Sequence, residues 1–170
     1  MVGMGVEVRR ARPDEASELK RLRLEMLRDS PSSFEERLER VEAWDEGRWT
    51  SRLTSMSAPD SALFIAAEDD AWVAQAAGRV YGTYVPPRAY LLSVYVTPSH
   101  RGRRLVEKVV ERVEDWARGL GFSELYLDVH EGAAAARTAY ARMGYVDTGV
   151  TTPYANNEAE SEIELAKQLD

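Results

Sequence analysis

The chain has 170 residues, of which 44% are hydrophobic and 30% charged, and its formal net charge is −7. This length and balance predict one compact domain over residues 1–170 and exclude a disordered chain. No apolar run is long enough to cross a bilayer, and the acidic balance argues against a nucleic-acid partner.

Cysteine is absent, which excludes disulfides, thiolate metal sites and cysteine nucleophiles. The two histidines, His100 and His130, are too few for a histidine-rich metal centre, so no metal is expected. The first residues, Met1 to Val6, lack a basic region followed by a long apolar one, so no signal peptide is expected. We therefore expect a cytoplasmic protein without a membrane partner, as a monomer or a homodimer.

The first half of the chain alternates between strand-like and helix-like patterns. Ser33 and Glu36 have capping-box spacing and predict the start of a second helix, and Asp45 restarts the helical pattern. Gly78 and Gly82 interrupt a long strand and indicate bulges. In chain order, the patterns predict a strand at 6–9, a helix from Pro13 to a break at Ser30, helical stretches from Ser33 and from Asp45, and strands at 61–67, 71–84 and 89–96.

The second half begins with a well-specified amphipathic helix after Arg104. Its apolar stripe, which Gly119 and Gly121 end, consists of Leu105, Val109, Val113, Trp116 and Leu120. The patterns that follow predict a strand at 124–129, a further helix, and strands at 145–150 and 160–167. The polar stretch 151–157 is predicted to be a loop that could cover an active site.

An arginine- and glycine-rich loop, Arg101-Gly-Arg-Arg104, stands between the strand at 89–96 and this helix. A loop that opens a helix can direct backbone N–H groups and the positive end of the helix dipole at one phosphate or pyrophosphate. The side chains of Arg101, Arg103 and Arg104 add mobile positive charge. The loop therefore predicts a site for an anionic cofactor.

A second motif follows the strand at 124–129, and it reads His130-Glu-Gly-Ala-Ala-Ala-Ala-Arg-Thr-Ala-Tyr-Ala-Arg-Met-Gly-Tyr145. Together with the loop, it resembles the GCN5-related N-acetyltransferase (GNAT) superfamily. That family has an Arg/Gln-x-x-Gly-x-Gly/Ala loop and an Asn-x-x-Ala-x-x-x-Tyr-x-x-x-Gly-Phe/Tyr helix. The residues that match are Arg101 in the loop and Ala136, Tyr140, Gly144 and Tyr145 in the helix. The order of elements fits from about Val6 to the C-terminus.

Three positions depart from the family pattern. Arg104 and Val106 stand where the loop normally has small residues, and Ala133 stands where the helix normally has Asn. Arg104 keeps its backbone N–H for a phosphate if its conformation is helical, whereas the branched Val106 would crowd the pyrophosphate. Ala133 removes one hydrogen bond, which is typically worth about 0.5–1.5 kcal/mol. We favour a working enzyme with a weaker or shifted hold on the cofactor.

The resemblance implies an α/β fold with a mixed, mostly antiparallel twisted sheet of six or seven strands and about four helices on both faces. The fourth and fifth strands are expected to run parallel and to splay apart, so that the pantetheine arm enters the gap. Backbone groups of Val94, Tyr95 and Val96 would pair with this arm like an extra strand. A backbone N–H there would also polarise the thioester carbonyl.

The resemblance also implies acetyl-CoA as cosubstrate and direct transfer of its acetyl group to a primary amine of a small molecule or a peptide. Tyr140 is predicted to donate a proton to the leaving thiolate, and packing in the core is the alternative role. The residues predicted to bind the cofactor are Val94, Tyr95, Val96, Arg101, Gly102, Arg103, Arg104, Leu105, Val106 and Ala136.

The proton acceptor is not identified by the sequence, because the strand at 89–96 carries no acidic residue. Candidate bases are His130 and Glu131, candidate substrate contacts are Glu35 and Glu36, and Asp128 is expected to pair with an arginine. Tyr81, Tyr84 and Tyr90 could line a pocket for an apolar or cationic acceptor.

Two other functions stay open at this point. A regulatory module that binds CoA without turnover would account for the three departures from the motifs. A nucleotide-phosphate binder of another family uses only the arginine loop and leaves the Tyr140 helix unexplained.

Overall fold

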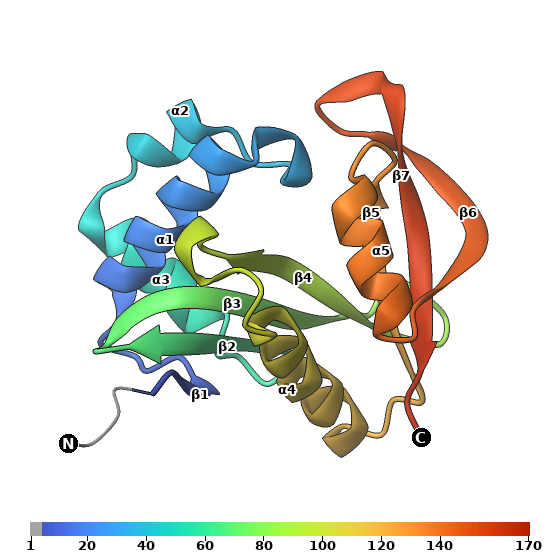
Figure 1. The fold of residues 1–170 in the computed structure, drawn as a ribbon, viewed down its shortest axis with the longest axis horizontal. Coiled ribbons are helices and arrows are strands. Elements are labelled where there is room, and N and C mark those ends of the chain that lie inside the picture. The colour runs from blue at the N-terminus through green and yellow to red at the C-terminus, as the bar shows by residue number, and fades with distance from the viewer. Residues whose placement is uncertain (1–4) are drawn as a thin grey trace.

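The computed structural model describes residues 5–170, so Met1 to Met4, within the segment analysed for a signal peptide, lie outside the described residues. Its seven strands form one sheet in the order β1-β2-β3-β4-β5-β7-β6 (Figure 1). The elements are β1 Glu7–Arg10, α1 Ala16–Asp29, α2 Leu38–Glu42, α3 Glu46–Ser55, β2 Ser61–Glu68, β3 Ala71–Tyr81, β4 Arg88–Val96, α4 Leu105–Gly119, β5 Glu124–His130, α5 Ala134–Arg142, β6 Val146–Tyr154 and β7 Asn157–Gln168.

The predicted α/β fold is confirmed. Every strand pair is antiparallel except β4 with β5. The described residues form five α-helices, where about four were expected. None of these helices has the length and apolar character needed to cross a membrane.

Helices cover both faces of the sheet, and side chains of β2 alternate between two cores. Leu63 and Ile65 pack with Leu22 and Trp49 from α1 and α3, whereas Phe64 packs with the apolar stripe of α4. α5 lies on the same face as α4, beside β5 and β7 (Figure 1).

The predicted bulges at Gly78 and Gly82 are wrong. Gly78 pairs regularly with Ala62, and Gly82 lies beyond the end of β3. Gly78 instead allows close packing, because an added Cβ would lie 2.7 Å from Cε3 of Trp116 on α4. The close approach of α4 to β3 therefore accounts for this glycine, and a bulge does not.

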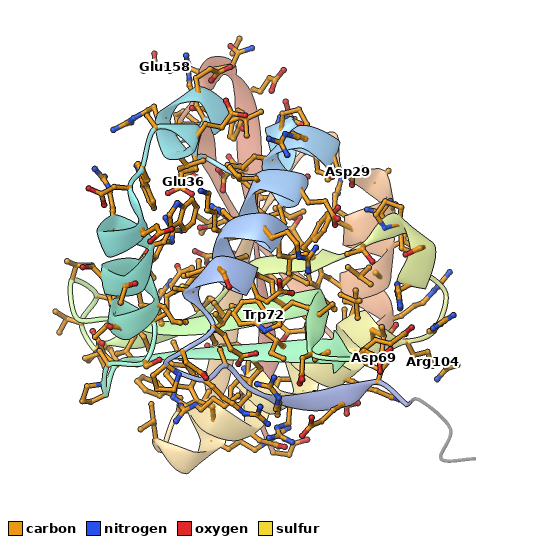
Figure 2. The ribbon with its side chains drawn as sticks, turned by 90° about the vertical axis from the view of Figure 1, so that its left-hand side faces the viewer. Asp29, Glu36, Asp69, Trp72, Arg104 and Glu158 are labelled. Atoms are coloured by element: carbon orange, nitrogen blue, oxygen red, sulfur yellow. The ribbon has the colours of Figure 1, made fainter. Side chains whose placement is uncertain are left out.

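The predicted capping box at Ser33 and Glu36 is also wrong. Phe34 is extended, and α2 begins only at Leu38. Two guanidinium groups bind the carboxylate of Glu36 instead: Nε of Arg23 at 2.8 Å and Nη1 of Arg52 at 2.5 Å. Glu36 therefore joins α1 to α3 (Figure 2).

The predicted loop at 151–157 is largely strand, because β6 and β7 form one long hairpin. Strands at the edge of a sheet can be polar on both faces, and β6 is exposed along nearly its whole length. The end of the hairpin reaches the segment before α2. There, the Tyr154 hydroxyl donates to the Phe34 carbonyl at 3.2 Å, and Nδ2 of Asn156 donates to the Glu35 carbonyl at 3.0 Å.

β4 and β5 run parallel and separate after two residue pairs, as expected. Only Ala89 with Leu125 and Tyr90 with Tyr126 are in register. Ser93 has a left-handed backbone, with φ 53°, where the register between β3 and β4 shifts. The side chain of Gln75 fixes this bulge by donating to the Ser93 carbonyl at 3.0 Å. After Tyr90, the edge of β4 that faces β5 has no partner strand in the described chain.

Candidate active site

A cavity of about 590 Å³ occupies the gap between β4 and β5. β4 contributes residues 90–94, β5 contributes residues 127–130, and α5 closes one side with Ala133, Ala136 and Tyr140. Residues 33–36, Glu162 of β7, Arg23 of α1, and Tyr81, Thr83 and Tyr84 at and after the end of β3 complete the lining. A second cavity of about 550 Å³ lies against α3; it is lined by Glu36 but by none of the residues predicted to bind the cofactor or to donate the proton.

Tyr140, Ala136 and Val94 are brought together in this cavity by α5 and β4. The ring of Tyr140 packs edge-on against Tyr145, with 5.8 Å between centroids. Burial raises the pKa of the Tyr140 phenol, so the group stays protonated at neutral pH. Tyr140 can therefore act as a proton donor, and it also packs against the core.

The predicted phosphate loop lies between the end of β4 and the start of α4, outside the cavity lining. Gly102 has φ 82°, and Arg104 has φ 58° and ψ 27°. Arg104 therefore adopts the left-handed conformation that the family's glycine adopts readily, and not the right-handed helical one considered above. Among residues 5–170, no side chain caps the N-terminus of α4, so its first N–H groups can point at an anion.

Two of the loop arginines are less mobile than expected. Nη2 of Arg101 lies 2.7 Å from Oδ2 of Asp29, and its Nε donates to the Val96 carbonyl at 3.3 Å. Nη1 of Arg103 lies 3.6 Å from the carboxylate of Glu68. Arg104 forms none of these ion pairs and lies at the edge of the molecule (Figure 2). The Arg101 contact joins the loop to the end of α1.

The remaining predicted cofactor residues are partly structural. The side chains of Tyr95 and Leu105 are buried. Tyr95 lies in the core between the sheet and helices α1 and α3, and Leu105 lies in the core between the sheet and α4. They offer only backbone groups to a ligand, as does Val96. Val106 is half-buried and packs against the α4 core.

Two carboxyl groups of the cavity have markedly raised pKa values. Asp128 is an exposed position of β5, yet its carboxyl group lines the cavity, where partial desolvation, Glu164 and Glu35 raise its pKa to about 6. Burial, Glu35 and Asp128 raise the pKa of Glu162 to about 7, against a small opposing effect of His130. Both groups can therefore exchange a proton near neutral pH.

The expected pairing of Asp128 with an arginine is wrong. Within residues 5–170, no arginine or lysine nitrogen lies within 4.0 Å of its carboxylate. The register explains its environment, because Asp128 stands opposite Glu164, and His130 stands opposite Glu162. The alternation of β5 and β7 was the signal in the sequence that could have placed these residues on one face.

The other candidate bases differ in their availability. Nε2 of His130 lies 2.5 Å from Glu160, and the backbone N–H of Gly132 donates to Nδ1 at 3.0 Å. Both ring nitrogens of His130 are therefore occupied. Glu131 does not line the cavity, whereas Glu35 does.

An aromatic wall faces these carboxyl groups. Tyr81, Tyr84 and Tyr90 line the cavity, and the Tyr90 hydroxyl donates to that of Tyr84 at 3.0 Å. The ring of Tyr90 stacks with that of Tyr84 and with that of Tyr126, in each case with 5.6 Å between centroids. The cavity thus combines acidic groups with aromatic faces.

The sequence is similar to known acetyltransferases. The model of the Acetyltransferase (GNAT) family matches residues 21–145. Streptothricin acetyltransferase of Streptomyces lavendulae is 31% identical over 104 residues, which are 61% of this chain and 54% of that protein. IAA acetyltransferase of Azospirillum brasilense is 34% identical over 61 residues, or 36% of this chain and 40% of that protein. The alignments thus span about half of these relatives or less.

The fold is also that of a solved acetyltransferase structure. The structure of yncA from Salmonella typhimurium, determined with its cofactor acetyl-CoA, matches with a TM-score of 0.77. The match covers 98% of this chain and 95% of that chain at 16% sequence identity.

Proposed function

The chain belongs to the acetyltransferase (GNAT) family, and on this premise we propose that it transfers an acetyl group from acetyl-CoA directly to a primary amine. The observation that carries the proposal is the cavity between β4 and β5. There, the phenol of Tyr140 and the carboxyl groups of Asp128 and Glu162 line one space beside the open edge of β4.

Two features of the chain and one solved structure of the same fold support acetyl-CoA as the donor. The unpaired edge of β4 offers backbone groups to an extended arm. The left-handed residues Gly102 and Arg104 precede the uncapped end of α4, where a pyrophosphate would accept N–H bonds. The solved yncA structure holds acetyl-CoA on the same fold. When bound, acetyl-CoA supplies an activated thioester whose sulfur leaves as a thiolate.

The residues of the cavity can complete the proton balance of the transfer. As the amine nitrogen forms its bond to the acetyl carbon, it must lose one proton, and the departing sulfur must gain one. The carboxyl pair Asp128 and Glu162 accepts the first proton, because the raised pKa values keep these groups near their titration point. Tyr140, whose raised pKa keeps its hydroxyl protonated, donates the second.

The substitution Tyr140→Phe tests this proposal. Loss of the proton donor is expected to lower kcat about 10²- to 10⁴-fold while the affinity for acetyl-CoA is retained. CoA release with a panel of primary amines measures turnover, and calorimetric titration measures binding of acetyl-CoA, with ATP and NAD as control ligands.

Tyr126→Phe is the matched control, because the Tyr126 hydroxyl bonds to Glu124 and does not line the cavity. An unchanged kcat in Tyr140→Phe would contradict the assigned role. Binding of acetyl-CoA without turnover of any amine would favour a CoA-binding module, as the departures at Arg104, Val106 and Ala133 suggest.

A further inference from the structure

The cavity carries more negative charge than its own arginine balances. Four carboxylates line it, and Arg23 is the one arginine or lysine in the described lining. Nε of Arg23 donates to Glu36, which Arg52 also binds. Glu35, Asp128 and Glu162 form no ion pair with any described arginine or lysine. These three residues are called the acidic wall below.

This excess of charge is unfavourable for an acceptor with a single amino group. The reacting amine must be neutral to attack, yet an acidic wall stabilises its protonated form and so raises the pKa of the amine. An ammonium group that stays charged would balance the wall. It would also relieve the repulsion from neighbouring carboxylates that, in addition to desolvation, raises the pKa values of Asp128 and Glu162.

Two further features of the cavity match such a molecule. Tyr81, Tyr84 and Tyr90 line the cavity, and the guanidinium groups of Arg79 and Arg88 already lie over the rings of Tyr81 and Tyr84, at 5.8 and 4.6 Å from the ring centres. A ligand ammonium group would make cation–π contacts with the ring surface that these arginines leave open to the cavity. Arg23 is only 6% exposed, and its buried Nη1 has no hydrogen-bond partner among the described residues. A buried donor without a partner is unfavourable, so an oxygen of the ligand is expected to accept from it. An uncharged oxygen suits this place, since Glu36 lies beside Arg23.

We infer that the acceptor is a small dicationic amine. One amino group is acetylated, a second ammonium group lies against the acidic wall beside the tyrosine faces, and an uncharged oxygen of the same molecule accepts from Arg23. This inference rests on the proposed function and adds the class of acceptor to it.

A matched series of four amines tests the inference. Butylamine, 1,4-diaminobutane and 4-aminobutanoate share four carbons and differ in the distal group, which is apolar, cationic or anionic. Ornithine amide is 1,4-diaminobutane with a carboxamide added, and therefore supplies the oxygen. We expect kcat/KM to be about 10- to 100-fold higher for 1,4-diaminobutane than for butylamine, since one charged contact contributes about 1.5–3 kcal/mol.

The other two amines define the remaining contacts. Ornithine amide is expected to exceed 1,4-diaminobutane, and 4-aminobutanoate to fall below butylamine. Equal or higher kcat/KM for butylamine than for 1,4-diaminobutane overturns the dicationic acceptor and leaves the proposed acetyl transfer intact. Absence of CoA release with all four amines, while acetyl-CoA binds, contradicts the proposed function together with the inference.

Glu35→Gln removes a carboxylate of the acidic wall that is outside the pair assigned to proton transfer. The variant is expected to raise KM for 1,4-diaminobutane several-fold and to bring the kcat/KM values for 1,4-diaminobutane and butylamine closer together. Glu39→Gln, an exposed change of the same kind on α2, is the control and should alter neither constant. An unchanged KM for 1,4-diaminobutane in Glu35→Gln would contradict the acidic wall.

Discussion

The carboxyl groups of Asp128 and Glu162 lower the stability of the fold at neutral pH. In an unfolded chain such groups titrate near pH 4, whereas burial and neighbouring carboxylates raise their pKa values to about 6 and about 7 in the fold. Between about pH 4 and the raised pKa values of the fold, the folded protein therefore binds more protons than the unfolded chain. Their stabilising contribution is therefore complete below about pH 4 and is lost as the pH rises through 6 and 7.

Replacing Glu162 with Gln should therefore raise Tm at pH 7.5 and, at the same time, lower the rate of acetyl transfer. The gain in Tm should shrink toward pH 4, where the wild-type carboxyl group is protonated in the fold. In the wild type, kcat/KM should fall as the pH drops from 7 to 6, because the proton acceptors become protonated. Thermal unfolding and initial rates from pH 4 to 8 measure both effects.

Glu158→Gln on the same strand is the control for the loss of one negative charge, since Glu158 is exposed at the end of the hairpin. A lower Tm for Glu162→Gln than for the wild type at pH 7.5 would show that the carboxylate is stabilised by the cavity and not destabilised by it.

At the scale of single residues, the sequence predicted Tyr140 and Ala136 because a motif fixes their spacing on one helix. It did not predict the state of Asp128 and Glu162. Strand alternation places such residues on one face, but it does not tell which strands are neighbours. The pairing of β5 with β7, distant along the chain, creates the repulsion between carboxylates.

The loop that is predicted to bind phosphate, Arg101 to Arg104, joins α4 through one residue with a strained backbone. Arg104 immediately precedes α4 with φ 58°, a conformation that costs a residue with a Cβ roughly 1–2 kcal/mol. Glycine adopts it without this cost, although it adds about 0.4–1 kcal/mol of conformational entropy to the unfolded chain. The balance favours glycine at this position.

Arg104→Gly is therefore expected to raise the free energy of unfolding by roughly 0.5 kcal/mol, and to keep or improve the affinity for acetyl-CoA. Chemical denaturation and calorimetric titration measure the two effects. Arg103→Gly is the control in the neighbouring position, where φ is not positive, and it should lower stability. A loss of stability in Arg104→Gly equal to that in Arg103→Gly would contradict the strain.

At the scale of elements, the sequence predicted most helices and strands and failed where long-range contacts decided. The spacing of Ser33 and Glu36 suits a capping box, but Arg23 and Arg52 bind the carboxylate of Glu36. The polar residues 151–154 suit a loop, but pairing with β7 makes them an edge strand. Local propensity is weak against such tertiary contacts.

Across the whole molecule, the sheet consists of two parts that share little pairing. β1–β4 form one part and β5–β7 the other, and only two residue pairs join them. A ligand that pairs with the free edge of β4 would occupy the space between the parts. Binding should therefore protect backbone amides far from the reacting atoms and stabilise the entire fold.

We expect acetyl-CoA at about 100 times its Kd to add about 2.7 kcal/mol to the free energy of unfolding, and to raise Tm by about 5–10 °C. Hydrogen exchange should slow at Val94 to Val96 and in the first turn of α4. ATP, which lacks the pantetheine arm, is the control and should leave the β4 amides unprotected. Protection confined to α4 with acetyl-CoA would contradict pairing along β4.

The alternation of side chains along β5 also bears on how the enzyme could diverge. Leu127 and Val129 are core residues packed with α4, whereas Asp128 and His130 stand opposite acidic residues of β7. Neighbouring codons thus serve different ends: one set fills the core beneath the cavity, and the other sets the charge of the cavity wall. A duplicated copy of this gene can therefore change the charge of the wall by single substitutions at alternate positions while the core is retained, but a change at Asp128 would also remove a proposed proton acceptor.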